Sequence, residues 1–306
     1  MAPAVHVAVQ LPHAMQVCKS GSRSKISRAV SKSLADLHLG FKERSNIKEV
    51  FTIPELSPSL YDYILIPGDI VHSGKVLEDK QIQKDVVDKL AILTGTTPTY
   101  VSLGNHDQFE RFGFETWSAY CANAAISTFN ILPNMKLLDI NQKIVTEDLE
   151  FSAINNSVHY YLEKHESSEF FEQEVSLRQN KISFTEDYFS ILLTHDPKSI
   201  YRISKERGEC FIPNTNLVVS GHMHNGFTPN KLQTVLNGHG ILSPDYTLFP
   251  EIAYGIKEVR ETIFLINGAV SSFVEVPIIN KLFGINCTIL ELHPQEETKK
   301  LVYTYK

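Results

Sequence analysis

The stretch Tyr61-Asp-Tyr-Ile-Leu-Ile-Pro67, followed at once by Gly68-Asp69, shows the pattern that organises this chain. It is an apolar run of strand length that ends in a polar turn. The pattern returns at residues 98–103, before Gly104-Asn105-His106-Asp107. It returns twice more in the second half of the chain, at residues 188–193 before Thr194-His195-Asp196-Pro197 and at residues 216–220 before Gly221-His222-Met223-His224.

Helix-like segments alternate with these strands. Residues 77–93 place Ile82, Val86, Leu90 and Leu93 at helical spacing, and residues 109–125 and 162–178 are also expected to be helical. Several strands are expected over residues 131–161, and two more at residues 262–265 and 286–292. Alternating strands and helices followed by paired strands predict an α/β sandwich with mixed sheets.

The first 33 residues differ from the rest. The first acidic residue is Asp36, and residues 19–33 carry five basic side chains among serines. We expect residues 1–33 to form a basic, Ser-rich and poorly ordered leader, and residues 34–306 to form a single domain.

Composition excludes several classes of protein. The chain has 306 residues, 42% of them hydrophobic and 21% charged, which is typical of a globular protein. Lys plus Arg is 29 and Asp plus Glu is 35, giving a formal net charge of −6. We therefore expect no nucleic-acid partner, because phosphate binding needs a basic face. The four cysteines show no CxxC spacing and no run is long enough to span a membrane, so a cytoplasmic protein is expected.

The polar turns carry side chains that bind metals. In α/β sheets the carboxyl ends of neighbouring strands meet at one edge, so residues distant in sequence converge there. Imidazole, carboxylate and carboxamide donors without a thiolate suit Mn, Fe, Zn, Co or Ni. The donors are too many for one tetrahedral ion, and two ions about 3.5–4 Å apart can clamp a phosphoryl group.

Five segments in order resemble the motifs of the calcineurin-like metallophosphoesterases. They are Asp36-Leu-His38, Gly68-Asp69, Gly104-Asn105-His106-Asp107, His195 and Gly221-His222-Met223-His224. The resemblance implies a β-sandwich of two mixed sheets flanked by helices, in α/β/β/α layers. It also implies a metal-dependent phosphoric ester hydrolase with two divalent ions.

The resemblance implies a role for each motif residue. One ion would be held by Asp36, His38, Asp69 and His224, and the other by Asp69, Asn105, His195 and His222, with Asp69 bridging. His106 would assist departure of the leaving oxygen, and Asp107 would lie behind it and orient its ring. Asp196 is expected to have a structural turn role before Pro197, with an outer-sphere role as the alternative.

The first motif has an unusual context. Residues 28–35 are mostly polar, whereas Asp36 should follow a buried apolar strand. We expect either a poor, edge-like strand there or a leader that has replaced the usual one. His72, His159 and His239 could line the site, but spacing alone does not place them.

The resemblance indicates the reaction better than the substrate. Residues 68–74 lack the arginine with which protein phosphatases of this superfamily grip phosphate, and the chain looks most like a bacterial branch of phosphodiesterases and pyrophosphatases. We predict a phosphodiesterase that uses a metal-bridging hydroxide. A phosphomonoesterase on a small metabolite is the alternative, and a catalytically silent protein-binding scaffold is a third reading.

The apolar residues after the last motif have two interpretations. They could form a rim that faces a lipid-linked substrate or a membrane surface, or they could be core, which the usual composition of protein interiors favours. They are Phe227, Leu248, Phe249, Phe273, Val276, Ile278, Ile279, Leu282 and Phe283. The substrate is therefore expected to be a small-molecule or lipid-linked phosphate ester, with peripheral membrane contact and the oligomeric state left open.

Overall fold

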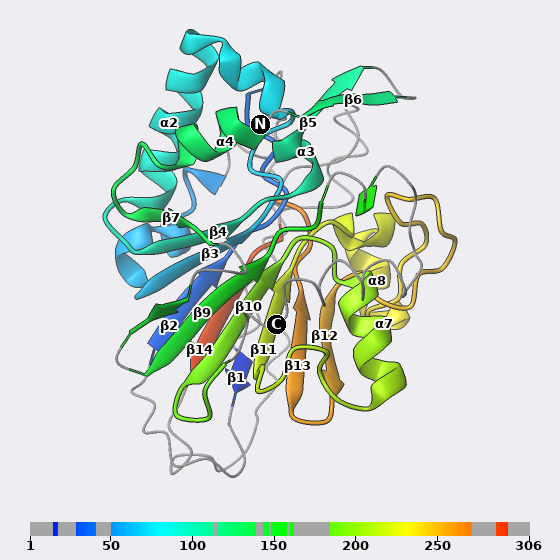
Figure 1. Ribbon diagram of the computed structural model, residues 1–306. Coiled ribbons are helices and arrows are strands. Elements are labelled where there is room, and N and C mark those ends of the chain that lie inside the picture. Colours follow the sequence, from blue (N-terminus) through cyan, green and yellow to red (C-terminus); the bar gives the residue numbers. More distant parts are fainter. Residues whose placement is uncertain are drawn as a thin grey trace, which may run out of the picture.

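The computed structural model describes residues 15–17, 29–40, 50–112, 116–120, 122–138, 143–146, 148–157, 160–161, 184–270 and 286–292. Two mixed six-stranded sheets organise these residues (Figure 1). In spatial order, the first consists of β1 (Met15–Val17), β14 (Thr288–Leu292), β2 (Ala29–Ser33), β3 (Tyr63–Pro67), β4 (Thr99–Ser102) and β7 (Met135–Leu137). The second consists of β12 (Gly255–Val259), β13 (Thr262–Ile266), β11 (Leu217–Ser220), β10 (Phe189–Thr194), β9 (Leu149–Ile154) and β8 (Ile144–Val145).

The two sheets pack face to face, with helices outside. Leu65 and Tyr100 of the first sheet share one buried cluster with Phe151, Leu193 and Val219 of the second. The helices are α2 (Lys80–Thr94), α3 (Asn105–Gln108), α4 (Ala122–Phe129), α7 (Lys198–Arg207) and α8 (Asn230–Leu236). Figure 1 shows α2 and α4 on one side of the sandwich and α7 and α8 on the other. The predicted α/β/β/α layering is confirmed.

The strands before the predicted motifs form as expected. β3, β4, β10 and β11 run parallel to their neighbours within the sheets, and nearly all their residues are buried. Strands covered on both faces read as continuous apolar runs, which is why they stand out in the sequence. Helix α2 buries Val86, Leu90 and Leu93, and Asp79 caps it by accepting hydrogen bonds from the backbone of Gln81 and Ile82.

The helix expected over residues 109–125 is wrong. A two-stranded antiparallel hairpin, β5 (Phe109–Phe112) and β6 (Thr116–Tyr120), occupies most of this segment, and a helix begins only at Ala122. The segment is rich in aromatic residues, which favour strands. The helix expected over residues 162–178 lies outside the described residues.

A regular strand lies before Asp36, and it is not at the edge of its sheet. β2 lies in the interior of the first sheet, antiparallel to β14 and parallel to β3. Its polar side chains are buried with partners: the Lys32 Nζ donates to the carbonyls of Leu56 (2.7 Å) and Leu93 (3.3 Å) and lies over the ring of Tyr61. A polar strand can therefore occupy the sheet interior because its hydrogen-bonding groups are satisfied.

The two strands described within residues 1–33, β1 and β2, both belong to the first sheet. The last five residues of the expected leader are thus part of the sandwich. Among the described residues, no helix is both long and apolar enough to cross a bilayer.

We predict that Lys32 makes stability depend on pH. Burial lowers the pKa of this amine to about 8, so between pH 8 and its ordinary pKa of 10.5 the unfolded chain binds a proton that the folded chain has lost. Stability therefore rises with pH in this window, by about 3 kcal/mol at most. Urea unfolding of wild type, Lys32→Met and the exposed-site control Lys84→Met should show this rise in wild type and the control only. A rise of equal size in Lys32→Met would contradict the assignment.

Candidate metal centre

All seven side chains expected to bind metals come together at the carboxyl ends of five strands. Asp36 and His38 follow β2, Asp69 follows β3, Asn105 follows β4, His195 follows β10, and His222 and His224 follow β11. All seven are buried, with less than a tenth of each residue exposed. Two backbone hydrogen bonds join the turns after β2 and β3: the N–H of Asp36 donates to Gly68 O, and the N–H of His38 donates to Asp69 O.

A first donor group consists of Asp36, His38, Asp69 and His224. One ligand atom from each lies within 4.8 Å of the others. Nε2 of His38 is 3.8 Å from Oδ2 of Asp69, and Nε2 of His224 is 3.6 Å from Oδ1 of Asp36. These are the four residues that the resemblance assigns to one ion.

A second donor group consists of Asp69, His195 and His222, again within 4.8 Å. Nε2 of His195 lies 3.1 Å from Oδ2 of Asp69, 3.1 Å from Oδ1 of Asn105 and 3.2 Å from Nδ1 of His222. Asn105 therefore belongs to this group. Asp69 is common to both groups.

Backbone conformation directs the side chains into the centre. Asp36, His38, Asp69, His222 and His224 all have φ between 46° and 66°. Positive φ is uncommon for residues other than glycine and concentrates at functional sites. The carboxylates hold the turns in return: the backbone N–H of His222 donates to Asp36 (3.1 Å to Oδ2), and that of His106 donates to Asp69 Oδ1 (2.9 Å).

Two glycines allow the strand ends to approach each other. A Cβ on Gly104 would lie 2.8 Å from Cγ of Asp69 and closer still to its Oδ1. A Cβ on Gly221 would lie 2.7 Å from Cβ of Ala35 and 2.9 Å from Oδ2 of Asp36. Gly104 therefore makes room for the carboxylate that follows the neighbouring strand β3, and Gly221 makes room for the carboxylate that follows β2 of the other sheet.

The centre concentrates buried negative charge. Burial raises the pKa of Asp36 to about 8 and that of Asp107 to about 7, and the nearby Asp69 adds to both shifts. For Asp69 itself burial is outweighed by His195, His106 and His38, which hold its pKa well below the usual range. Burial lowers the pKa of His222 to about 4, which favours the neutral imidazole that binds metals.

These residues fit two divalent cations. Each group combines carboxylate oxygen with imidazole nitrogen, a donor set suited to borderline metals. Cations in the centre would offset the carboxylate charge that burial otherwise disfavours.

The orienting role predicted for Asp107 needs correction. Its carboxylate accepts from the backbone N–H groups of Val71 (3.0 Å) and Gly104 (2.8 Å), so it ties the turn after β3 to the turn after β4. The ring of His106 is oriented instead by the carbonyl of His72, which lies 2.6 Å from Nδ1. A carbonyl can only accept, so this contact places the proton on Nδ1 and turns Nε2 toward Asp69, 4.0 Å from its Oδ2.

Asp196 has the contacts of a turn residue and also lies near a predicted metal ligand. Its Oδ1 accepts from the backbone of Lys198, as a turn residue does, while its Oδ2 accepts from the Tyr160 hydroxyl (3.0 Å) and lies 3.9 Å from Nε2 of His222. Lys198 is held in turn by Asp245.

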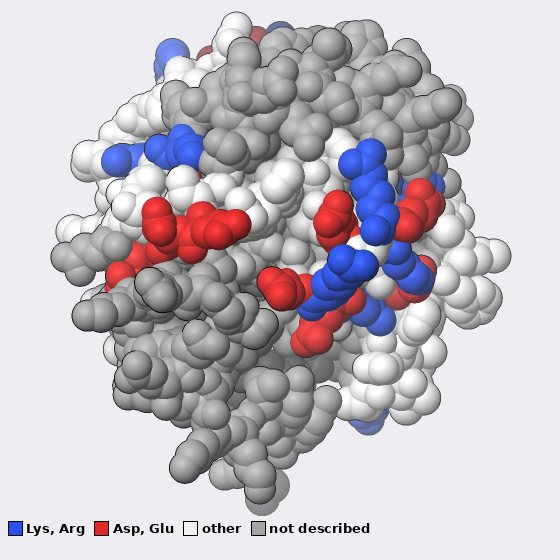
Figure 2. All heavy atoms as spheres, turned by 60° about the horizontal axis from the view of Figure 1, so that its bottom comes forward, with Lys and Arg blue, Asp and Glu red and all other residues white. Residues whose placement is uncertain are grey.

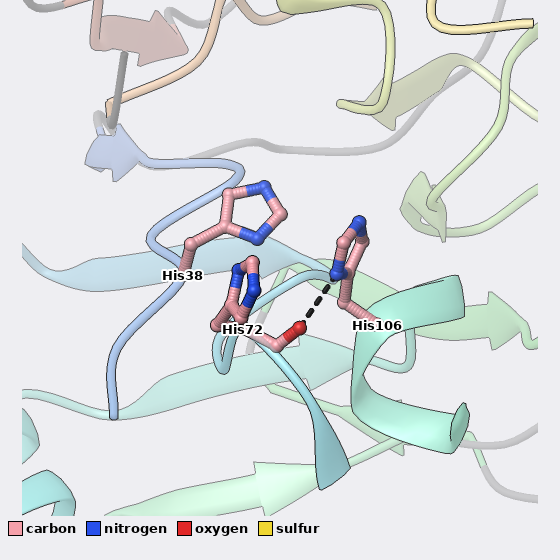
Figure 3. A group of neighbouring side chains, drawn as sticks. All are labelled: His38, His72 and His106. Atoms are coloured by element: carbon pink, nitrogen blue, oxygen red, sulfur yellow. Dashed lines mark hydrogen bonds between the residues drawn. The ribbon is translucent and has the colours of Figure 1, made fainter. Parts of the chain in front are cut away.

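The structure places His72, which the sequence left unassigned, beside the metal centre. Its ring lies beside those of His38 and His106, with centroids 6.0 and 5.5 Å away (Figure 3). The signal in the sequence is its place three residues after Asp69, which cannot show which way the ring points. His239 is exposed on the turn after α8, and His159 lies outside the described residues.

The family model of the calcineurin-like phosphoesterases matches residues 33–226, well over half of the chain. The chain belongs to this family. It is therefore a metal-dependent hydrolase of phosphoric esters, as the resemblance implied. None of the curated protein sequences matches it significantly.

Solved structures with a similar arrangement include three proteins of low sequence identity. Phosphopantetheinyl hydrolase of Mycobacterium tuberculosis is 12% identical, with 78% of this chain and 89% of that one covered and a TM-score of 0.42. A dimetal phosphatase of Danio rerio is 8% identical, with coverage of 81% and 89% and a TM-score of 0.42. TT1561 of Thermus thermophilus is 11% identical, with coverage of 79% and 90% and a TM-score of 0.44.

We predict that Gly104→Ala disrupts the metal centre of this phosphoesterase, because the added methyl group displaces the Asp69 carboxylate shared by both donor groups. Metal content after dialysis, measured by mass spectrometry, should fall below one ion per chain. Gly255→Ala is the control: no atom lies within 4 Å of its added Cβ, so it should cost only about 1–2 kcal/mol of backbone strain and keep its metals. Full metal content in Gly104→Ala would contradict the packing argument.

Proposed function

We propose that this phosphoesterase uses two divalent ions to hydrolyse a phosphodiester. One ion is held by Asp36, His38, Asp69 and His224. The other is held by Asp69, Asn105, His195 and His222. The observation that carries the proposal is that Asp69 belongs to both donor groups, because a shared carboxylate places two ions side by side. When bound, the ions supply Lewis-acid charge and activate water for attack on phosphorus.

His106 is the proposed general acid. Its Nδ1–H is fixed by the carbonyl of His72, and its ring is 12% exposed, so Nε2 can reach both the centre and an incoming ester. In the protonated ring, Nε2 donates a proton to the leaving oxygen as the P–O bond breaks. Asp107 supports this geometry indirectly, by joining the turns that carry Asp69 and His106.

The charges near the centre favour a diester over a monoester. A phosphate diester carries one negative charge, whereas a monoester carries up to two at neutral pH. Residues 68–74 offer no arginine, and Lys198 is already held by Asp245 and Asp196. The runner-up remains a phosphomonoesterase on a small metabolite. A silent scaffold is disfavoured, because all seven donors are present and gathered.

The test compares the metal-loaded wild type with His106→Ala. We expect about two ions per wild-type chain, and faster turnover of bis-para-nitrophenyl phosphate than of para-nitrophenyl phosphate. His106→Ala should lower turnover roughly 10²-fold and keep both ions, whereas the exposed-site control His239→Ala should match wild type. A well-folded wild type without metal or turnover would overturn the proposed function, and loss of metal in His106→Ala would overturn the role given to this histidine.

An exposed apolar loop, joined at its base to the segment after His224, supports an ester with an apolar part. Tyr246, Leu248 and Phe249, here called the apolar rim, are 73%, 67% and 70% exposed, so the expectation that Leu248 and Phe249 are core is wrong. Phe227 is half-buried, and the residues expected at 273–283 lie outside the described part of the chain.

The loop that carries the apolar rim is joined to the metal centre at its base. The backbone N–H groups of Ile241 and Leu242 both donate to the carbonyl of Gly226, two residues after His224. On the other side of the loop, Asp245 pairs with Lys198. Polar groups thus fix the loop to the site while its large apolar side chains face solvent. We therefore propose that the substrate is an ester whose apolar chain lies on this rim.

We predict that the double substitution Leu248→Ser, Phe249→Ser selectively weakens binding of esters with long alkyl chains. Burying one such side chain contributes about 1.5–3 kcal/mol, so KM for a long-chain alkyl para-nitrophenyl phosphodiester should rise tenfold or more. KM for the methyl analogue should stay unchanged. Val235→Ser, 76% exposed on α8, is the control. An equal rise for both esters would contradict a role for the rim in binding the chain.

The surface charge accords with a small or lipid-linked ester rather than a nucleic acid as substrate. On the face shown in Figure 2, basic side chains lie beside acidic ones instead of forming a stripe of one sign. The exposed ion pair Lys205–Glu251 shows the same mixing of signs. Nucleic-acid binding depends on such a stripe. We also propose that the protein is cytoplasmic and that the apolar rim contacts a membrane surface peripherally.

A further inference from the structure

His38, His72 and His106 form a third group of ligand atoms that lie within 4.8 Å of one another. The rings of His38 and His106 meet edge to face, with centroids 4.5 Å apart, and the His72 ring lies beside both (Figure 3). His38 also belongs to the first donor group, whereas His72 belongs to neither group proposed to hold the catalytic ions.

This group differs chemically from the other two because it consists of imidazoles alone. Imidazole suits zinc, copper and nickel, whereas manganese and magnesium prefer carboxylate and other oxygen donors. Zinc–nitrogen bonds of about 2.0–2.1 Å place tetrahedral ligand atoms about 3.3 Å apart. Ligand atoms that lie within 4.8 Å of one another would therefore have to close by about 1.5 Å at most.

The hydrogen bond between His106 and His72 decides which nitrogen meets the ion. Nδ1 of His106 faces the His72 carbonyl at 2.6 Å, so coordination of an ion through Nε2 would keep this hydrogen bond. A ring N–H donated to a carbonyl is the usual second contact of a metal-binding histidine. Nε2 is also the atom proposed above to protonate the leaving oxygen.

We propose that His38, His72 and His106 form an inhibitory site for a zinc-class ion. Binding there withdraws His38 from the first donor group and occupies Nε2 of His106, so zinc excess stops turnover while manganese, which prefers the carboxylate-containing groups, does not. The inhibition rests on the proposed function of His106, but the binding of zinc by His72 does not.

The experiment reads two signals, by titrating zinc into the metal-free full chain for the first and into the manganese-loaded full chain for the second. The first is the ring nitrogen resonances of the histidines in the diamagnetic zinc-loaded protein, with His72 identified from its absence in His72→Gln. The second is turnover of bis-para-nitrophenyl phosphate. We expect the His72 ring resonance to shift on addition of zinc beyond two equivalents. At free zinc about ten times the dissociation constant, mass action should leave about one wild-type chain in ten active.

The variant His72→Gln should keep most of its own zinc-free activity at the same zinc concentration, and the exposed-site control His239→Gln should be inhibited like wild type. If zinc moves the resonances of His195, His222 and His224 but not that of His72, or inhibits wild type and His72→Gln equally, the inhibitory site is overturned and the proposed function stands. If zinc moves none of these resonances, both fail.

Discussion

The close approach of neighbouring strand ends is the constraint on which the rest of the site depends. Asp69 and Asp36 occupy space that side chains on Gly104 and Gly221 would otherwise fill. Because these positions carry only hydrogen, a carboxylate from the next strand of the same sheet and one from the facing sheet can lie between the turns. The donors from five strands then reach one volume without any loop having to extend toward it.

The same crowding accounts for the unusual backbone of the centre. Five of the seven donors have left-handed backbone conformations, each costing roughly 1–2 kcal/mol for a residue other than glycine. Hydrogen bonds from the turns to Asp36, Asp69 and Asp107 stabilise these conformations, so the donors are held in position before any cation arrives. A rigid donor set of this kind loses little freedom when it binds an ion, which is the advantage of preorganisation.

The environment of His106 connects the two proposals made for this phosphoesterase. The His72 carbonyl fixes the ring so that Nε2 faces the centre, which suits proton donation to a leaving group. The same orientation presents Nε2 to any imidazole-preferring ion that His72 and His38 can share. The identity of the ions in the centre therefore bears directly on whether His106 can act.

Sequence alone determined the strands before the four later motifs, the order of the turns and the types of donor. Apolar runs such as residues 61–67 and glycines before polar turns are local signals, and four such turns follow strands whose carboxyl ends meet at one end of the sandwich. The motifs also identified the family, because the spacing and the donor types recur together.

Only the tertiary structure decided what depends on packing between distant segments. The polar strand β2 lies inside the sheet because Lys32 finds carbonyls 24 and 61 residues away, which no local pattern reveals. In the same way, Asp107 bonds to Val71 rather than orienting His106, and His72 turns toward His38. Leu248 and Phe249 are large apolar residues of the kind found in cores, and only the folded structure shows that their side chains face solvent. Hydrophobicity is a property of the residue, but burial is a property of its neighbours in space.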